Sequence, residues 1–508
     1  VKYYSYSRNT CQNPRTYLDE NTDMNDQYIQ MCCNIFSDYQ KAKESRGYLD
    51  FDDLLDRFGN ILSRKPELRK AVTRLFDEVL VDEMQDTNPL QFIILRHFSD
   101  EGVRLFCVGD PAQSIYRFRG AEFEHVYRFS ELFERSLTLP LSINYRSYQE
   151  VLDLANWLID RSPLDYANRL IADRGDCGNL PMLVDFDSTQ DEAAWIAERI
   201  LERKECDIAC RDIMVLVRTG FDAKHIEAEF IQQQIPYRFI GGTALTKTAH
   251  VRDVLSLLRV IRNAQDDLAW MRYLKLWPRI GEKTAEKVIN AFYEEAAKQP
   301  GGILEDKFGN NHAVVSAYKE TFDERTSTKN CVSSAVECLT PILRERYDRW
   351  NYRSQDLRLL VTVADRYKAI SDFIDAFTLE PMTSTEIEKM EVDDAVTLIT
   401  VHSAKGTEAP ICFVANAKPG TYPHIRSYGN IQSEEEERRV LYVALTRAKN
   451  ELFITRSTNY RSGFYVANEP TEGEEYFLAA VPNRLVTKES HGWSAYDGND
   501  LCKLQDIY

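Results

Sequence analysis

Two acidic residues directly follow an apolar run in the segment VLVDEMQD, where Asp82 and Glu83 come after Val81. The apolar run predicts a β-strand over residues 78–81, and the ligands of α/β folds bind beyond the carboxyl ends of such strands. One carboxylate there can hold Mg²⁺, directly or through water, and its neighbour can orient or deprotonate an attacking water. By itself this common pattern favours no more than a solvated strand end.

A second apolar run leads into a polar and aromatic turn in the segment RLFCVGDPAQSIYRFRGA. Gln113 in this turn could sense a terminal phosphate by hydrogen bonding. Tyr116, Phe118 and Arg119 follow as an aromatic and cationic cluster, which suits stacking on nucleic-acid bases and contact with phosphates. Phe118 could instead be a core aromatic, but its position between Arg117 and Arg119 makes that alternative less favoured.

A third segment, LPLSINYRS, sets a flat ring beside a guanidinium group, at Tyr145 and Arg146. That pair could stack on an adenine and touch a γ-phosphate. The three segments together indicate a nucleotide-hydrolysing site next to a turn that binds nucleic acid.

The elements that must position these residues alternate between short β-branched runs and longer helical patterns, which is typical of layered α/β folds with parallel sheets. Between about residues 251 and 375 a largely helical pattern replaces the strands. We therefore expect the second of two α/β domains to be split around a helical insertion, with an exposed linker over 379–394. Besides 78–81, the predicted strands lie at 104–108, 213–217, 396–400, 411–415 and 451–455.

Composition limits the class of protein. The 508 residues, 44% of them hydrophobic, suffice for several packed domains. Because the sequence has neither a membrane-length apolar run nor a secretory signal pattern at its start, we expect a cytoplasmic protein without membrane contact. Its 11 cysteines lack zinc-site spacing, so we expect ordinary thiols. The net charge of −17 disfavours a nucleic-acid partner on average, but basic residues gather locally around Arg117, Arg119, Arg279 and Lys283.

Five segments, in this order, resemble motifs II to VI of UvrD-like superfamily 1A helicases: DEMQDTN, VGDPAQSIYRFRGA, NYRS, TVHSAKGTE and LYVALTRAKNEL. The segments SRGYLDFDDLL, IPYRFIGGTALTKTAHVRDVLSLLRVIRN and PRIGEKTAEKV also resemble this family, so the likeness covers all but the extreme ends. The resemblance implies an α/β fold with two RecA-like parallel-sheet domains. The first would be incomplete, and the second would carry a helical insertion.

The resemblance also implies ATP and Mg²⁺ as cofactors and gives roles to individual residues. Asp82 would be the Mg²⁺-linked acid and Glu83 the residue that activates water. Gln113 would couple the state of the γ-phosphate to the DNA-facing turn.

Four further residues are implied to contact the nucleotide. Tyr145 would stack on the base of ATP, and Glu408 would lie near the ribose. Arg146 and Arg447 would act as arginine fingers that stabilise charge on the transferring phosphoryl group.

The implied DNA contacts come from three segments, and Phe118 stands where the family usually has Trp. The PRIGEKT segment resembles a loop that contacts duplex DNA, although a simple helix cap fits it equally well. The residues implied to contact DNA are Tyr116, Phe118, Arg119, Thr400, His402, Lys405, Gly281, Lys283 and Thr284.

No G-x-x-x-x-G-K-[ST] phosphate loop occurs in the 508 residues, and GEKT at 281–284 lacks the preceding glycine. We therefore expect this chain alone to bind Mg·ATP weakly. The favoured function is an ATP-dependent 3′–5′ DNA helicase and single-strand translocase, acting on single-stranded DNA and on junctions with duplex. The alternative is a non-hydrolysing helicase-like module that binds DNA or a protein partner.

The resemblance also sets the expected domain boundaries. Residues 1–50 would be a remnant of a helical insertion in the first domain, and 51–140 the C-terminal part of its RecA-like sheet domain. The second RecA-like domain would comprise 141–245 and 395–470, with its helical insertion over 246–394. We expect residues 471–508 to be an acidic tail.

Overall fold

The computed structural model describes residues 2–22, 24–133, 136–166, 168–295, 298–310, 312–321, 327–378, 394–457 and 477–491. Its contacts divide the chain into two compact units. The first, which we call the N-terminal unit, comprises residues 1–180, 419–447 and 468–486. The second, the sheet unit, comprises residues 181–418, 448–467 and 487–508.

The N-terminal unit begins with five helices, the last of which ends shortly before the first strand. Asp50 and Asp53 form a capping box that fixes the start of α4. Lys43 joins α3 to that cap, because its ammonium group lies 2.6 Å from both Asp50 and Asp53. The helices are α1 (Lys2–Asn9), α2 (Pro14–Asn21), α3 (Asp26–Arg46), α4 (Phe51–Arg64) and α5 (Pro66–Thr73).

Two parallel strands, β1 (Glu78–Val81) and β2 (Arg104–Cys107), are joined by α6 (Pro89–Asp100). Their side chains at Val79 and Leu105 pack with α4 and α6 around Leu62 and Phe98. On the opposite face, Leu80 and Phe106 are register partners and are 72% and 59% exposed. Parallel sheets are normally covered on both faces, so this face of the unit is open to a further layer.

The rest of the N-terminal unit is built from short elements around two longer helices, α9 and α22, which pack on each other. The turn after β2 contains two 3₁₀ helices, η2 and η3. The elements are η1 (Met84–Asp86), η2 (Pro111–Gln113), η3 (Arg117–Arg119), α7 (Glu124–Tyr127), α8 (Phe129–Leu132), β3 (Ile143–Asn144), α9 (Gln149–Asp160), β4 (Ile171–Ala172), η6 (Ile425–Ser427) and α22 (Ile431–Leu445).

The sheet unit is organised around a seven-stranded parallel sheet with the strand order β11-β5-β10-β9-β6-β8-β7. α10 (Thr189–Glu205) and α11 (Ala223–Gln232) pack against each other, and Trp195 of α10 meets Phe413 and Phe453 of the sheet. The strands are β5 (Met182–Phe186), β6 (Ile213–Val217), β7 (Tyr237–Ile240), β8 (Val396–Thr400), β9 (Ala409–Val414), β10 (Ala448–Ser457) and β11 (Thr487–His491); η4 (Cys210–Asp212), η5 (Leu245–Lys247) and α21 (Val401–Ala404) are short helical turns.

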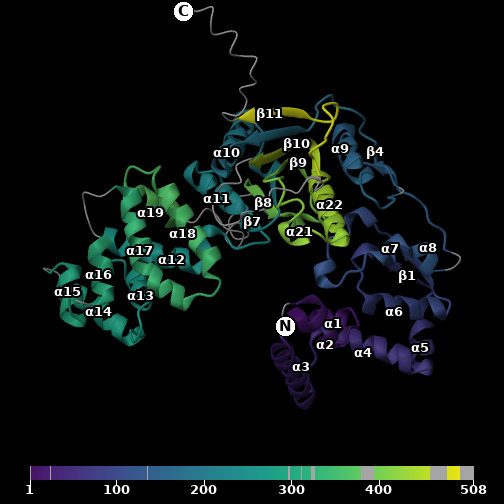
Figure 1. Ribbon diagram of the computed structural model, residues 1–508, viewed down its shortest axis with the longest axis horizontal. Helices are drawn as coiled ribbons and strands as arrows, with labels where there is room; N and C mark the ends of the chain where they lie inside the picture. Colours follow the sequence, from purple (N-terminus) through teal and green to yellow (C-terminus); the bar gives the residue numbers. More distant parts are fainter. Residues whose placement is uncertain are drawn as a thin grey trace, which may run out of the picture. The chain divides into compact units, whose positions relative to one another are not determined.

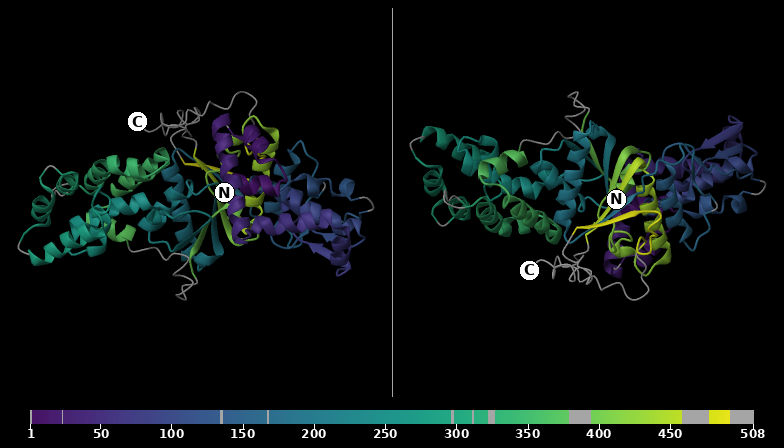
Figure 2. Two further views of the ribbon diagram at one scale, coloured as in Figure 1. Left: turned by 90° about the horizontal axis from the view of Figure 1, so that it is seen from below. Right: turned by 90° about the horizontal axis from the view of Figure 1, so that it is seen from above.

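The predicted helical insertion is confirmed between β7 and β8, where Figures 1 and 2 show a group of helices. Its buried residues, with Trp270 among the largest, form one apolar cluster with those of the sheet. The insertion is therefore packed onto its domain through a continuous core. The helices are α12 (Ala249–Arg262), α13 (Asp267–Leu274), α14 (Glu282–Glu294), α15 (Pro300–Phe308), α16 (Ala313–Thr321), α17 (Thr328–Arg346), α18 (Trp350–Ala364) and α19 (Ile370–Thr378).

The α/β fold with parallel sheets is confirmed, but the C-terminal part differs from expectation. Residues 487–491, expected in an acidic tail, form β11 and pair with β5 at the edge of the sheet. The strand reads TKESH, so it lacks the apolar alternation that predicts strands. Most of the linker predicted over 379–394 lies outside the described residues.

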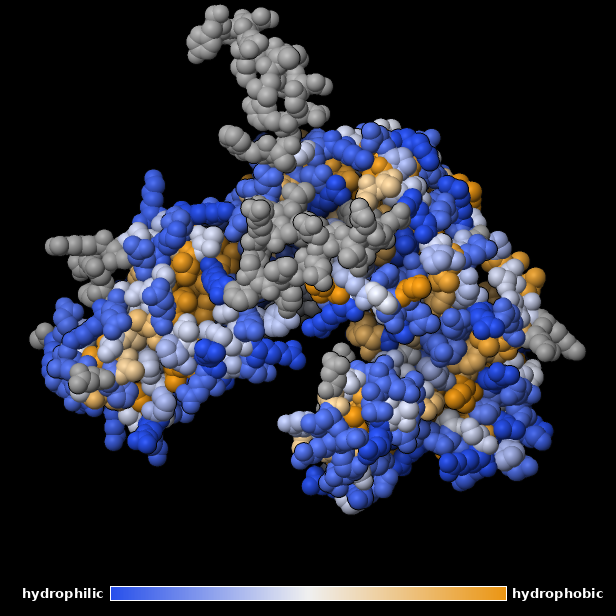
Figure 3. Space-filling model, viewed as in Figure 1, coloured by the Kyte–Doolittle hydropathy of each residue, from blue (hydrophilic) through white to orange (hydrophobic). Residues whose placement is uncertain are grey.

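The compact units also cut the chain at places other than the predicted domain boundaries. Residues 141–180 and 419–447 pack with the N-terminal unit, although we expected them in the second domain. The domain boundaries themselves stay a prediction. Within the described part of the chain, none of the helices is long and apolar enough to cross a membrane. The face drawn in Figure 3 is mostly hydrophilic, with scattered apolar residues.

Candidate functional site

The carboxyl end of β1 presents two carboxylates, those of Asp82 and Glu83. Asp82 Oδ1 accepts a hydrogen bond of 2.8 Å from the backbone N–H of Glu83. Glu83 has a φ of 50°, in the left-handed region that residues other than glycine rarely occupy. Such strained backbone occurs preferentially at functional sites, and here it turns the chain sharply as it leaves the strand.

A chain of hydrogen bonds joins Glu83 to the turn after β2. The side-chain amide of Gln85 donates to Glu83 and accepts from the Asp110 backbone N–H at 3.0 Å. Asp110 in turn accepts from the Gln113 amide at 2.7 Å. We call Glu83, Gln85, Asp110 and Gln113 the polar chain. A β-carbon on Gly109 would lie only 2.8 Å from the Gln85 side-chain oxygen, so this close approach requires glycine.

The guanidinium groups of both predicted arginine fingers lie at the C-terminal end of α22. Arg447 is 1% exposed, and its Nε donates to the Val443 carbonyl at 2.9 Å. Arg146 Nη1 donates to the Thr446 carbonyl at 3.2 Å. The two guanidinium groups are therefore anchored to the same turn of helix.

The buried phenol of Tyr442 is influenced by charges from both the polar chain and the two arginines. Burial raises the pKa of Tyr442 well above its ordinary value, and the Asp110 carboxylate raises it further. Arg447 and Arg146 oppose that shift, so all three charged groups act on one hydroxyl. Asp110, Arg146 and Arg447 of the N-terminal unit thus all influence the Tyr442 hydroxyl. Tyr145 is also in this unit and its ring is exposed.

The turn after the polar chain presents its aromatic side chains to the surface. Phe118 is 43% exposed, so it is not a core aromatic. The ring of Tyr116 lies 5.9 Å from that of Phe118, and the Arg119 guanidinium is 5.0 Å and 5.5 Å from the two ring centres. We call residues 114–119 the stacking turn. Two rings beside one cation form a combination that can stack on bases.

The remaining predicted site residues belong to the sheet unit. Thr400, at the end of β8, is buried and its Oγ1 donates to Ser403 Oγ at 3.1 Å. A β-carbon on Gly241 would clash with Thr400 Oγ1, and Gly241 has a φ of 88°, so only glycine fits beside this segment. His402 and Lys405 follow Thr400 and are half-buried.

Two other groups of predicted residues lie at the surface of the sheet unit. Glu408 forms an ion pair of 2.8 Å with Lys449, a contact that a ribose-binding role would have to share. Gly281, Lys283 and Thr284 lie at the exposed start of α14, where Gly281 is the N-cap residue. Both a helix cap and a phosphate contact fit that position, because the first N–H groups of a helix point outward.

Sequence reasoning missed two residues of the site, Asp110 and Tyr442. Asp110 follows the predicted strand at much the same place as Asp82 follows β1, so its position was the available signal. Tyr442 had no such signal, because a tyrosine in a helical pattern is more often a core residue. For Mg²⁺, the described residues contain no cluster of three or more His, Cys, Asp or Glu arranged around a metal. A single carboxylate such as Asp82 still fits this ion, which takes most of its ligands from phosphates and water.

Comparison with protein families gives two adjacent matches. The family model described as "UvrD/REP helicase N-terminal domain" matches residues 3–134, and "UvrD-like helicase C-terminal domain" matches residues 139–459. The second match alone covers more than half of the chain. Together they include the polar chain, the stacking turn and both arginines.

Individual relatives agree with the family matches. A "Probable DNA helicase II homolog" of Mycoplasma capricolum is 30% identical over 439 residues, which are 83% of this chain and 60% of the relative. The "ATP-dependent DNA helicase PcrA" of Staphylococcus epidermidis is 28% identical over 503 residues, covering 94% of this chain and 67% of the relative. The PcrA of Staphylococcus aureus is 28% identical over 505 residues, covering 94% and 68%. The chain thus spans about two thirds or less of these relatives.

Proposed function

The chain belongs to the UvrD-like helicase family, and from this membership we propose that it is the greater part of an ATP-dependent DNA helicase. It would move 3′ to 5′ along single-stranded DNA and open junctions with duplex. The observation that carries this proposal is that one compact unit holds both Glu83 and Gln113, in a single chain of hydrogen bonds, and Arg146 and Arg447, anchored at one helix end. A module that only binds DNA has no physical need for that set.

Each residue of the set has a task that its geometry allows. ATP bound with Mg²⁺ supplies the phosphoryl group whose transfer to water releases the energy for movement. Glu83 is exposed at the strand end, so its carboxylate can take a proton from the attacking water. Asp82 beside it can hold the metal ion. Arg146 and Arg447 would supply the positive charge that stabilises the anionic transition state.

The polar chain provides the route from nucleotide to DNA. Gln113 lies one residue before the stacking turn and is held by Asp110. The turn itself is tied to Gln85, because Ser114 Oγ donates to the Gln85 carbonyl at 3.2 Å. A shift of Gln113 toward a terminal phosphate would therefore move the segment that carries Tyr116 and Phe118.

We expect the phosphates of ATP to be bound by an additional α/β segment that carries a glycine-rich loop. The open face of the β1–β2 sheet supports this proposal, because Leu80 and Phe106 expose large apolar area on it. The described residues pair no third strand with β1 or β2. A segment with a parallel strand and an apolar helix face would complete the sheet and place its loop near Asp82.

Replacing Phe118 with Ala tests the DNA-binding half of the proposal. Stacking of a base on an aromatic ring contributes about 1–3 kcal/mol, so we expect affinity for single-stranded DNA to fall by roughly five- to 150-fold. Fluorescence anisotropy with a labelled oligothymidine at fixed salt measures this. Phe76→Ala is the matched control, because Phe76 is 48% exposed but precedes β1. Equal affinity of Phe118→Ala and wild type would remove Phe118 from the DNA-binding surface.

A further inference from the structure

Arg439 of α22 is a buried arginine that contacts three separate segments of the N-terminal unit. It is 4% exposed, and its Nε donates to the Ser114 carbonyl, at the start of the stacking turn, at 2.7 Å. Its Nη1 donates to the Tyr166 hydroxyl at 3.3 Å. Its guanidinium group lies 4.5 Å from the ring centre of Phe123. A charged group buried this deeply requires such partners, so the contacts define where the turn can sit.

A second set of contacts joins α22 to the middle of the same turn. The backbone N–H of Arg117 donates to Glu436 Oε1 at 3.2 Å, and Arg117 Nη2 donates to Gln432 Oε1 at 3.1 Å. Burial raises the pKa of Glu436, while Arg439 and Arg117 oppose that shift. Gln432, Glu436 and Arg439 follow one another at intervals of about one helical turn, so one face of α22 makes all of these contacts.

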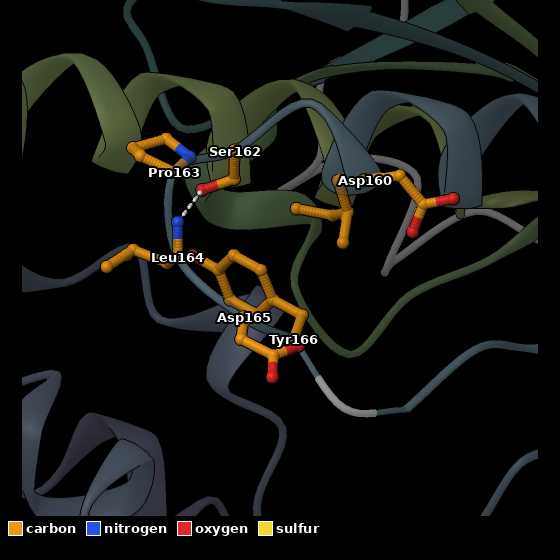
Figure 4. Close-up of a pocket in the computed structure, with 7 residues that line it drawn as sticks. Asp160, Ser162, Pro163, Leu164, Asp165 and Tyr166 are labelled. Atoms are coloured by element: carbon orange, nitrogen blue, oxygen red, sulfur yellow. Dashed lines mark hydrogen bonds between the residues drawn. The ribbon is translucent and has the colours of Figure 1, made fainter.

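Tyr166, the hydroxyl partner of Arg439, lies in the loop that follows α9. Figure 4 shows Ser162, Leu164 and Tyr166, which line one pocket, with the Leu164 N–H donating to Ser162 Oγ at 3.1 Å. The Ser162 hydroxyl also bonds to Glu435 of α22. The loop that carries Tyr166, the partner of Arg439, is therefore also tied to α22 through Ser162.

We propose that Arg439 and Glu436 are positioning residues that lock the stacking turn onto α22, the helix whose end carries Arg447. Neither side chain needs to contact DNA or nucleotide for this role. These contacts then hold the base-stacking rings in a fixed position against the helix. The inference rests on the proposed function, because the stacking turn needs a fixed position only if it binds DNA.

The test is single-stranded DNA affinity of the 508-residue chain, measured by anisotropy with a labelled oligothymidine. Glu436→Ala removes the acceptor for the Arg117 N–H, so we expect binding to weaken about five- to twentyfold. Glu436→Gln keeps an oxygen acceptor in the same place, so it should bind within about twofold of wild type. Arg439→Gln should weaken binding at least as much as Glu436→Ala, because it removes the anchor at the start of the turn.

Arg438→Ala is the matched control, because Arg438 lies on the same helix but pairs with Glu435 at 3.0 Å. It should leave DNA affinity unchanged even if it lowers the melting temperature. Equal binding by Glu436→Ala, Glu436→Gln and wild type would overturn the inference while leaving the proposed function intact. Absence of oligothymidine binding by the wild-type chain would overturn both. Glu436→Ala and Glu436→Gln differ in whether they keep the hydrogen-bond acceptor. Comparing these two variants therefore tests the inference even if Arg439→Gln fails to fold.

Discussion

Glu83→Gln is expected to reduce ATP turnover by about 10²–10⁴-fold, the usual contribution of a general base, in a protein that joins these 508 residues to a phosphate loop. A Gln side chain has nearly the same size and can still accept the hydrogen bond from Gln85, but it cannot take a proton from water. Affinity for single-stranded DNA should remain within about twofold, because Glu83 is not part of the stacking turn. Phosphate release with saturating DNA measures the effect.

Glu78→Gln provides the control for this experiment. Glu78 is an exposed acid at the opposite end of β1, so its loss should leave turnover unchanged. If Glu83→Gln hydrolysed ATP at the wild-type rate, Glu83 would lose its role and Asp82 would remain the only strand-end acid of β1 to consider.

Arg447→Ala is expected to lower kcat by about 10³-fold, since arginine fingers contribute that much or more to phosphoryl transfer. Arg447→Lys should restore little of this, because an ammonium group lacks the planar fork that meets two phosphate oxygens. Steady-state kinetics should show the loss in kcat rather than in KM for ATP, as expected for an interaction made in the transition state.

Because Arg447 is 1% exposed, its removal also leaves a cavity, so stability must be measured alongside. Arg438→Ala again serves as the matched arginine on α22. A variant that melts at a lower temperature than wild type but keeps its full kcat would show that Arg447 is a structural arginine. Arg146→Ala, which removes the guanidinium group at the Thr446 carbonyl, should cause a loss of similar size.

Much of the fold could be predicted because buried strands leave a local pattern. The apolar runs at 78–81, 213–217 and 396–400 predict strands with the bounds that β1, β6 and β8 have. β5 and β7 are not among the predicted strands, because Met182–Phe186 and Tyr237–Ile240 mix charged residues with apolar ones. β11 is polar throughout and gains its strand structure only from pairing with β5.

The site was predictable as residue types but not as an arrangement. Asp82 and Glu83 mark a strand end in any α/β protein, so they could be found from their own neighbourhood. The polar chain depends on the register of β1 with β2, which brings Gln85 to Asp110. The role of α22 depends on residues 419–447 packing back onto the N-terminal unit, with 300 residues separating Arg146 from Thr446. No local sequence pattern predicts this long-range packing.

The central claim is that this chain holds the water-activating acid and the arginines of a DNA-stimulated ATPase, while the loop that binds the phosphates of ATP lies in an additional segment. DNA-stimulated phosphate release, measured side by side for the 508-residue chain and for the chain joined to a phosphate-loop segment, tests it most directly. We predict little turnover by the 508 residues, with or without single-stranded DNA, and strong DNA-stimulated turnover by the joined form. Strong DNA-stimulated turnover by the 508 residues alone would contradict the claim.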